Sequence, residues 1–188
     1  MKKDISSLNY DDLQKEILNL GLPKFRANQI FEWIHKYGAS DFSEMTNISK
    51  ALREQLNEIY FIPCCKIEDK YVSKIDDTVK YLFRLYDGEY VESVIMKYKY
   101  GYTICVSSQV GCKMGCRFCA STLAGFKRNL SAGEIEAQLH SAQKDLNVKI
   151  SHIVMMGIGE PLDNFDNVVS FLYNVNSEKG LNISMRNI

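Results

Sequence analysis

Residues 102–119 read YTICVSSQVGCKMGCRFC, an alternating run that leads directly into three closely spaced cysteines. The alternation predicts a β-strand, and the loop after it carries Cys112, Cys116 and Cys119, with three and then two residues between them. Structural zinc sites usually combine two well-separated ligand pairs, whereas a cubane iron–sulfur cluster takes one thiolate per iron. Three thiols on one loop therefore favour a 4Fe–4S cluster with one iron left open.

Another kind of metal site remains an alternative at this point. Cys105 is the nearest candidate for a fourth ligand, but it lies within the preceding strand and would have to reach round the loop. If it did so, the chain would be a zinc-stabilised RNA-binding module without catalysis. Cys64 and Cys65 match no motif, and we expect them to be buried small apolar residues.

The flanking sequence predicts the start of an α/β fold. Residues 66–108 alternate with period two, with a hairpin turn at Asp87–Gly88. Ser131 and Glu134 form a capping-box pattern that begins a helix, in which Ile135 and Leu139 face inward. A buried strand (HIVMMGIG, 152–159), a helix near 166–174 and an extended segment over 181–188 complete an alternating order typical of parallel sheets. Because so few βα units cannot close a barrel, we expect a truncated fold.

The first 60 residues are predicted to be helical. Apolar residues recur at helical spacing over 9–21 and 23–38, and a third helix is expected to start at Ser49 and to bury Leu52 and Leu56. We expect Trp33 in the core of this unit, and His35 and His140 on the surface. The predicted domains are a helical accessory (RNA-binding) domain at 1–62, an antiparallel β connector at 63–100 and an incomplete core domain at 101–188.

Composition and charge indicate a globular protein of the cytoplasm. Hydrophobic residues make up 46% and charged residues 24%, and the formal net charge is zero. No apolar run approaches the length of about 18 residues that spans a bilayer, and the amino terminus lacks a signal-peptide pattern. A stretch without acidic residues, between Glu92 and Glu134, interleaves basic and aromatic side chains, a composition that suits RNA or a solvated basic face.

The cysteine triplet, with Phe118 just before its last member, resembles the signature of radical S-adenosylmethionine enzymes. The run MMGIGEPLDN (155–164) is similar to the glycine–glutamate motif of that superfamily. A glycine-rich turn after a parallel strand is also where α/β folds place ligands. The resemblance implies that an open iron of the cluster chelates S-adenosylmethionine.

The match extends to the RlmN-type adenine methyltransferases, whose sister family is Cfr. It is carried by residues 91–135, by VMMGIGEPLDNFDNV (154–168) and by LPKFRANQIFEWIHKYG (22–38), and it covers the amino-terminal half of a family member. Within it, CASTLAGFKRNL (119–130) is more similar to RlmN than to Cfr. The implied fold is α/β (α+β overall): a helical accessory domain, a β-hairpin segment and the first βα units of a radical SAM partial TIM barrel. The implied reaction is methylation of adenine carbon 2 in 23S rRNA and tRNA, with Cfr-like methylation of carbon 8 as the alternative.

The resemblance also implies roles for individual residues. The cluster ligands would be Cys112, Cys116 and Cys119. S-adenosylmethionine would contact Gly159, Glu160 and Phe118. Glu92 would accept a proton and Cys105 would resolve an RNA adduct through a disulfide.

The same resemblance implies a missing part and a set of partners. The disulfide partner of Cys105, a methyl-carrying cysteine, lies in the later half of family members, so this chain is expected not to complete a cycle by itself. Lys97, Lys99, Lys127 and Arg128 are expected to contact RNA. The enzyme is expected to be monomeric and to receive electrons from an external flavodoxin-like donor.

Overall fold

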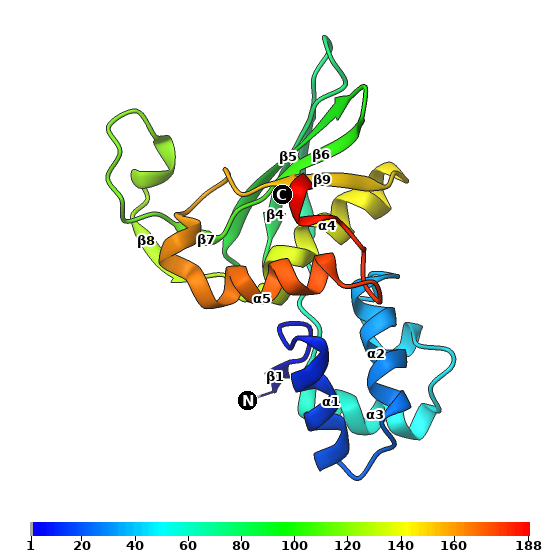
Figure 1. Ribbon diagram of the computed structural model, residues 1–188. Coiled ribbons are helices and arrows are strands. Elements are labelled where there is room, and N and C mark those ends of the chain that lie inside the picture. Colours follow the sequence, from blue (N-terminus) through cyan, green and yellow to red (C-terminus); the bar gives the residue numbers. More distant parts are fainter. Residues whose placement is uncertain (1) are drawn as a thin grey trace.

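The computed structural model describes residues 2–188, and its amino-terminal part is helical (Figure 1). Three α-helices form this helical unit: α1 (Tyr10–Asn19), α2 (Phe25–His35) and α3 (Lys50–Ile59). A 3-10 turn, η1 (Phe42–Glu44), lies between α2 and α3. Two very short strands, β1 (Lys3–Asp4) and β2 (Tyr60–Phe61), pair in parallel and join the two ends of the unit. No helix within residues 2–188 combines the length and the apolar composition that a membrane crossing requires.

Capping residues define where these helices begin and end. The Asn9 side chain accepts a hydrogen bond from the Asp12 amide at 3.0 Å, and Ser49 accepts one from the Leu52 amide at 3.4 Å. Gly21, with φ of +72°, follows α1 in the left-handed conformation that glycine adopts without strain. The apolar faces of the helices meet in a core of their own, which includes Leu13, Ile17, Ile30, Phe31 and Leu56.

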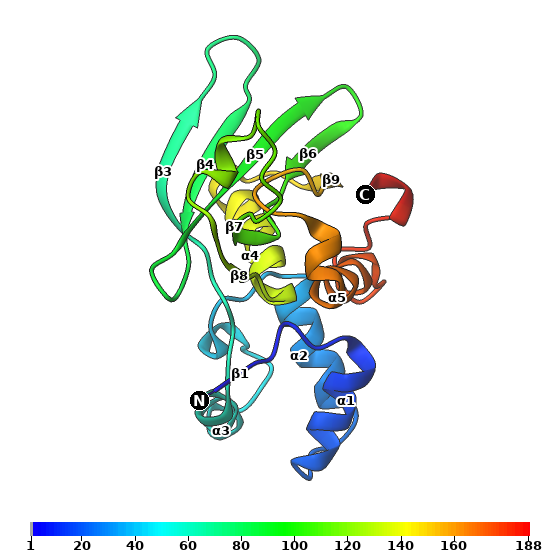
Figure 2. The same cartoon turned by 90° about the vertical axis from the view of Figure 1, so that its left-hand side faces the viewer.

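A five-stranded sheet forms the upper part of the molecule in Figures 1 and 2, in the order β3–β4–β5–β6–β9. Its strands are β3 (Lys66–Val72), β4 (Val79–Arg84), β5 (Tyr90–Tyr98), β6 (Gly101–Cys105) and β9 (Ile150–Val154). The pairs from β3 to β6 are antiparallel, whereas β6 and β9 are parallel. The connection from β6 to β9 contains helix α4 (Ala132–Leu146), as expected of a parallel crossover.

Helices α4 and α5 (Phe165–Asn176) lie between the sheet and the helical unit in both views. Along β4 and β5 every second side chain enters the core beneath the sheet, and Ile135 and Leu139 of α4 are buried there as predicted. The Ser131–Glu134 capping box is present at the start of α4. The sheet core is made mainly of Tyr81, Phe83, Val91, Ile95, Ile104 and Phe171 with these α4 residues.

Several sequence-based expectations differ from the structure. The buried strand expected over 152–159 is β9, but it ends at Val154, and Met156 in the loop after it is 82% exposed. A small antiparallel hairpin of β7 (Gln109–Gly111) and β8 (Phe126–Asn129) flanks the cysteine loop, and its strands are too short to show a period. The extended strand expected over 181–188 is wrong, because that segment ends in a 3-10 turn, η4 (Met185–Asn187). The Ile183 amide donates to the Val175 carbonyl at 2.9 Å, so the backbone folds back onto the end of α5 instead of running along β9.

A buried carboxylate on α4 joins the two cores. The carboxylate oxygens of Glu136 lie 2.8 Å from His35 Nδ1 and 3.2 Å from His140 Nε2. Desolvation by burial opposes the negative charge, but the two histidines outweigh it and lower the pKa of Glu136 to about 2. The His35 side chain is fully buried and that of His140 is 13% exposed, so the expectation of two surface histidines is wrong.

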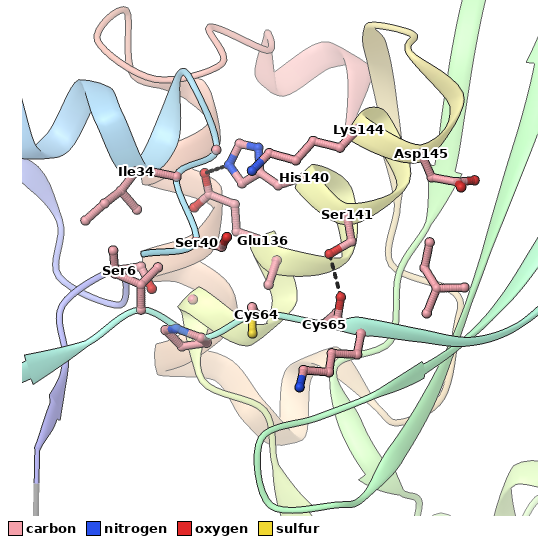
Figure 3. Close-up of a pocket in the computed structure, with 18 residues that line it drawn as sticks. Ser6, Ile34, Ser40, Cys64, Cys65, Glu136, His140, Ser141, Lys144 and Asp145 are labelled. Carbon is pink, nitrogen blue, oxygen red and sulfur yellow. Dashed lines mark hydrogen bonds and ion pairs between the residues drawn. The ribbon is translucent and has the colours of Figure 1, made fainter. Parts of the chain in front are cut away.

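A cavity of about 570 Å³ adjoins this contact, between the helical unit and α4 (Figure 3). Figure 3 shows Glu136 and His140 in contact at its wall, with Ile34 to the left and Cys64 below. Its lining contains none of the residues predicted to bind a cofactor. The cavity therefore belongs to the contact between the two cores and not to the predicted site.

Replacing Glu136 by Gln should weaken the contact between the helical unit and α4. The change removes the charge that His35 and His140 share, and breaking a buried pair by removing one partner typically costs about 3–5 kcal/mol. We expect the free energy of unfolding at pH 7, measured by urea titration, to fall by about 3 kcal/mol.

The pH dependence and a surface pair serve as controls. Because the pKa of Glu136 in the folded state lies below the ordinary glutamate pKa of 4.5, its contribution to stability is present above pH 4.5 and is lost as the pH falls toward about 2. The difference between the variant and the parent should therefore shrink in acid. Glu54→Gln, which breaks an exposed pair with Lys50, should cost less than about 0.5 kcal/mol. Equal losses in both variants would contradict the proposed contact.

Candidate functional site

The cysteine loop, residues 112–125, is closed at its base by β7 and β8. The Cys112 amide donates to the Gly125 carbonyl at 3.1 Å. The two ends of the loop come close together at Gly111, which has a φ of +72°. A Cβ added at Gly111 would lie 1.7 Å from the Gly125 carbonyl oxygen. The base of the loop therefore closes only because residue 111 has no side chain. Figure 1 shows the loop projecting from the sheet at the left.

The predicted cluster ligands share this loop but differ in exposure. Cys112 is buried at the base, Cys119 is half-buried and Cys116 is exposed. The Cys119 amide donates to the Cys116 carbonyl at 3.0 Å, which makes a tight turn between the last two ligands. Phe118, in that turn, is 94% exposed. All six cysteines are free thiols.

The donor set of the loop suits an iron–sulfur cluster, because three free thiols on one loop are ligands that such clusters take. The side chains are not drawn together into a finished ligand set. Within residues 2–188, no group of three or more His, Cys, Asp or Glu side chains is placed to hold a metal ion. The cysteine loop therefore agrees with the predicted cluster site in the type of its ligands and in its position in the fold.

The glycine loop, residues 157–160, follows β9 and rests on the segment that runs from β6 into β7. The Ile158 amide donates to Ser107 Oγ at 2.9 Å. Gly159, with φ of +105°, packs closely against Gln109. No side chain would fit at position 159, because a Cβ there would lie 2.6 Å from the Gln109 Cβ. The loop thus lies directly beside the segment that leads into the cysteine loop, at the carboxyl ends of two parallel strands, where α/β folds bind ligands.

Glu160 has its backbone and its side chain engaged separately. Its amide donates to Gln109 Oε1 at 2.9 Å, and its carboxylate accepts from the Leu162 amide at 3.1 Å in the turn η3 (Pro161–Asn164). Gly159 and Glu160 therefore lie at the same end of the sheet as the cysteine loop. The structure brings the two predicted cofactor motifs together, although they are far apart in the sequence.

Sequence reasoning missed the polar residues that hold these loops. Gln109 is fully buried, and its amide nitrogen donates to Asn129 Oδ1 at 2.8 Å and to Asp163 Oδ2 at 2.9 Å. Ser107, also fully buried, donates to the Glu92 carbonyl at 2.6 Å. The available signal was the run Ser-Ser-Gln directly after an apolar strand, because consecutive buried polar residues need partners from elsewhere in the fold.

Glu92 and Cys105 lie on the face of the sheet opposite the helices. Cys105 pairs with Val94 across β5 and β6, and Glu92 is two positions from Val94, so both side chains share that face. Glu92 accepts a salt bridge from Lys80 at 2.6 Å. Partial burial raises the pKa of the Cys105 thiol, an effect that a hydrogen bond from the Met156 backbone opposes in part.

The basic residues expected to contact RNA are partly engaged within the fold. Arg128 lies 2.7 Å from Asp87 and 2.7 Å from Glu134, which ties the β7–β8 hairpin to the β4–β5 turn and to α4. Lys127 pairs with Glu89 at 2.7 Å. Arg128 therefore has a structural role that the charge pattern alone did not indicate.

Comparison with known proteins agrees with this arrangement. Residues 3–62 match the protein family described as "Ribosomal RNA large subunit methyltransferase N-terminal domain". The chain is 52% identical to the "Probable dual-specificity RNA methyltransferase RlmN" of Lachnospira eligens, over 98% of this chain and 53% of the relative. It is 50% identical to the protein of the same name from Clostridium novyi, over 99% of this chain and 54% of the relative.

A solved structure gives the same result for the fold. The crystal structure of a radical SAM methyltransferase from Sphaerobacter thermophilus superposes with a TM-score of 0.90 at 35% identity, over 99% of this chain and 55% of that one. The fold is therefore that of the first βα units of a radical SAM partial barrel, preceded by a helical unit, as the sequence predicted.

Within that class, the chain is most similar in sequence to proteins called RlmN, among the relatives described above. It spans about half the length of the curated relatives that it matches, and it corresponds to their amino-terminal half.

Replacing Gly111 by Ala should open the base of the cysteine loop. The added methyl group would meet the Gly125 carbonyl, and the positive φ adds backbone strain. We expect the free energy of unfolding to fall by about 3 kcal/mol and limited proteolysis within residues 112–125 to accelerate. Gly115→Ala is the matched control, since its φ is +69° but nothing lies within 4 Å, so only strain of about 1 kcal/mol is expected. Equal effects at both positions would show that contact with Gly125 is unimportant.

The thiols should differ in reactivity according to their surroundings. Because burial raises the pKa of Cys105, less of it is thiolate at pH 8, and iodoacetamide should alkylate it about tenfold more slowly than the exposed Cys116. Cys65, which is buried and whose pKa is raised well above its ordinary value, should react most slowly. Peptide mapping by mass spectrometry gives the three rates, and a Cys105 as fast as Cys116 would contradict this order.

Proposed function

We propose that this chain is the amino-terminal half of a radical S-adenosylmethionine methyltransferase that acts on adenine in ribosomal and transfer RNA. The observation that carries the proposal is the contact between the two motif loops: the glycine loop rests on the segment from which the cysteine loop leaves. Similarity to the relatives supports the same proposed activity, since they carry the name of probable dual-specificity RNA methyltransferases.

The cofactor roles follow from the position and chemistry of the loops. Cys112, Cys116 and Cys119 would hold a 4Fe–4S cluster, and Gly159 and Glu160 would hold the amino-acid end of S-adenosylmethionine. The exposed ring of Phe118 would pack beside the adenine of that cosubstrate. When bound, these groups supply the radical chemistry that an aromatic carbon without nucleophilic character requires.

Glu92 and Cys105 are proposed as the residues that act on the RNA base. They share the sheet face that α4 and α5 leave open. Glu92 would accept a proton, with Lys80 at 2.6 Å keeping a positive charge beside its carboxylate. Cys105 would resolve a covalent adduct through a disulfide with a cysteine from the later half of the full-length protein. We therefore propose that this half alone does not turn over.

The RNA would meet several parts of this chain. We propose the division into a helical accessory domain (1–62), a β connector (63–100) and a core domain (101–188), with the first of these contacting RNA. At the tip of the β5–β6 hairpin, Tyr98 and Tyr100 stack at 5.1 Å and are exposed, next to Lys97 and Lys99. Such a cluster suits stacking on unpaired bases and contact with phosphates.

The finer features of the proposal rest on the family. Carbon 2 of adenine in 23S rRNA and in tRNA is the proposed target, rather than the carbon 8 of Cfr-like enzymes. A monomeric, cytoplasmic enzyme reduced by a flavodoxin-like protein completes the proposal.

Anaerobic reconstitution of the chain with iron and sulfide tests the assignment. A cubane cluster should give a brown protein with about four irons per chain, because each cluster contains that number. Cys112→Ala should lose the iron and Cys105→Ala should retain it. A colourless protein that holds one zinc ion, and loses it in Cys105→Ala, would instead establish the zinc-stabilised RNA-binding module.

A further inference from the structure

A buried glutamine connects the two motif loops. Gln109 is fully buried in β7, and its carbonyl oxygen accepts from the Glu160 amide at 2.9 Å. Its amide nitrogen donates to Asn129 in β8 and to Asp163 in η3, at 2.8 and 2.9 Å. One side chain therefore bonds to the glycine loop, to the turn after it and to the far strand of the hairpin that closes the cysteine loop.

The connection continues into the cysteine loop itself. One carboxylate oxygen of Asp163 accepts the hydrogen bond from Gln109, and the other lies 2.8 Å from Lys113 Nζ. Lys113 is the residue after Cys112. Hydrogen bonds from Lys113 and from Gln109 lower the pKa of Asp163, which agrees with a carboxylate held between two donors.

Glutamine suits position 109 because the site needs an acceptor and donors on one side chain. The Glu160 amide requires an acceptor, whereas Asn129 and Asp163 present oxygen atoms that require donors. A glutamate there would set two carboxylates against each other. Gly159 adds a steric condition, because a Cβ at that position would press on Gln109.

We propose that Gln109 and Asp163 are positioning residues that join the glycine loop and the cysteine loop into one mechanical unit, through Glu160 at one end and Lys113 at the other. A displacement of either loop is then transmitted to the other. The importance of this for cosubstrate binding rests on the proposed function, but the coupling itself is a property of the polypeptide and does not require a bound group.

Amide hydrogen exchange on the chain without iron tests the coupling directly. Lys113→Met removes the ion pair to Asp163 at a site where the lysine side chain is 53% exposed, so folding should be preserved. Exposed ion pairs contribute modestly, so we expect exchange in residues 157–164 to become about threefold faster, although the substitution lies in the other loop.

Lys127→Met is the matched control. That lysine belongs to the same hairpin and has a similar exposure of 57%, but it pairs with Glu89 and not with Asp163. Exchange in residues 157–164 should then match that of the parent. An unchanged rate in Lys113→Met, or equal acceleration in both variants, would overturn the proposal.

A charge exchange within the network tests the part played by Gln109. Gln109→Glu should accelerate exchange in both loops, because its carboxylate faces that of Asp163. Adding Asp163→Asn restores a donor to that contact but removes the ion pair to Lys113, so the double variant should return both loops part of the way to the parent rates, to about those of Lys113→Met. A double variant no slower in exchange than Gln109→Glu would show that repulsion at this contact is not the cause.

A second readout connects the network to the cosubstrate. After reconstitution, Lys113→Met should weaken S-adenosylmethionine binding in equilibrium dialysis by a similar factor of about three, with iron content unchanged. A parent chain that takes up no iron would overturn the proposed function, whereas the exchange experiment would still decide the coupling. An affinity equal to that of a parent that does bind would overturn the link between the network and the cosubstrate.

Discussion

The parallel pairing of β6 with β9 is the constraint from which the site follows. Its register sets Ile104 beside Ile153 and Cys105 beside Val154, so both strands end at the same level. Backbone hydrogen bonds continue beyond the strands, from the Val106 amide to the Val154 carbonyl at 3.0 Å and from the Gly157 amide to the Val106 carbonyl at 3.1 Å. Two loops that are distant in the sequence therefore start side by side. A slip of one residue in this register would turn every side chain of β9 to the other face and would separate the glycine loop from its support.

Helix α4 makes this pairing possible, and it also joins the helical unit to the sheet. One side of α4 carries Ile135 and Leu139 into the sheet core, and another carries Glu136 toward the end of α2. Its first turn is in contact with the amino-terminal segment as well, because the Gly133 amide donates to Ser7 Oγ at 3.0 Å. The helix that returns the chain to β9 is thus held from both sides, and the site is built on a support whose position two hydrophobic cores determine.

Much of this architecture was predictable from the sequence, because it depends on short-range patterns. Alternation along 79–98, the Asp87–Gly88 turn and the capping box at Ser131 each specify local structure, and all are present. The failures concern long-range polar contacts. His35 was expected on the surface because its partner, Glu136, is remote in the sequence. Gln109 passed unnoticed because its partners come from two other segments, at Asn129 and at residues 160–163. Periodicity reports which face of an element is apolar, but it does not report which buried donor meets which acceptor.

The position of β9 at the margin of the sheet has a consequence for how such a fold grows. Within residues 2–188, β9 pairs with β6 on one side, and its other side carries no strand. A strand added there in the same direction would deliver its own following loop to the end of the sheet where the cysteine and glycine loops already lie. Each further βα unit would add side chains at this end of the sheet and would leave the cysteine and glycine loops unchanged. A fold of this kind can therefore gain new functional groups without a change in the units that precede them.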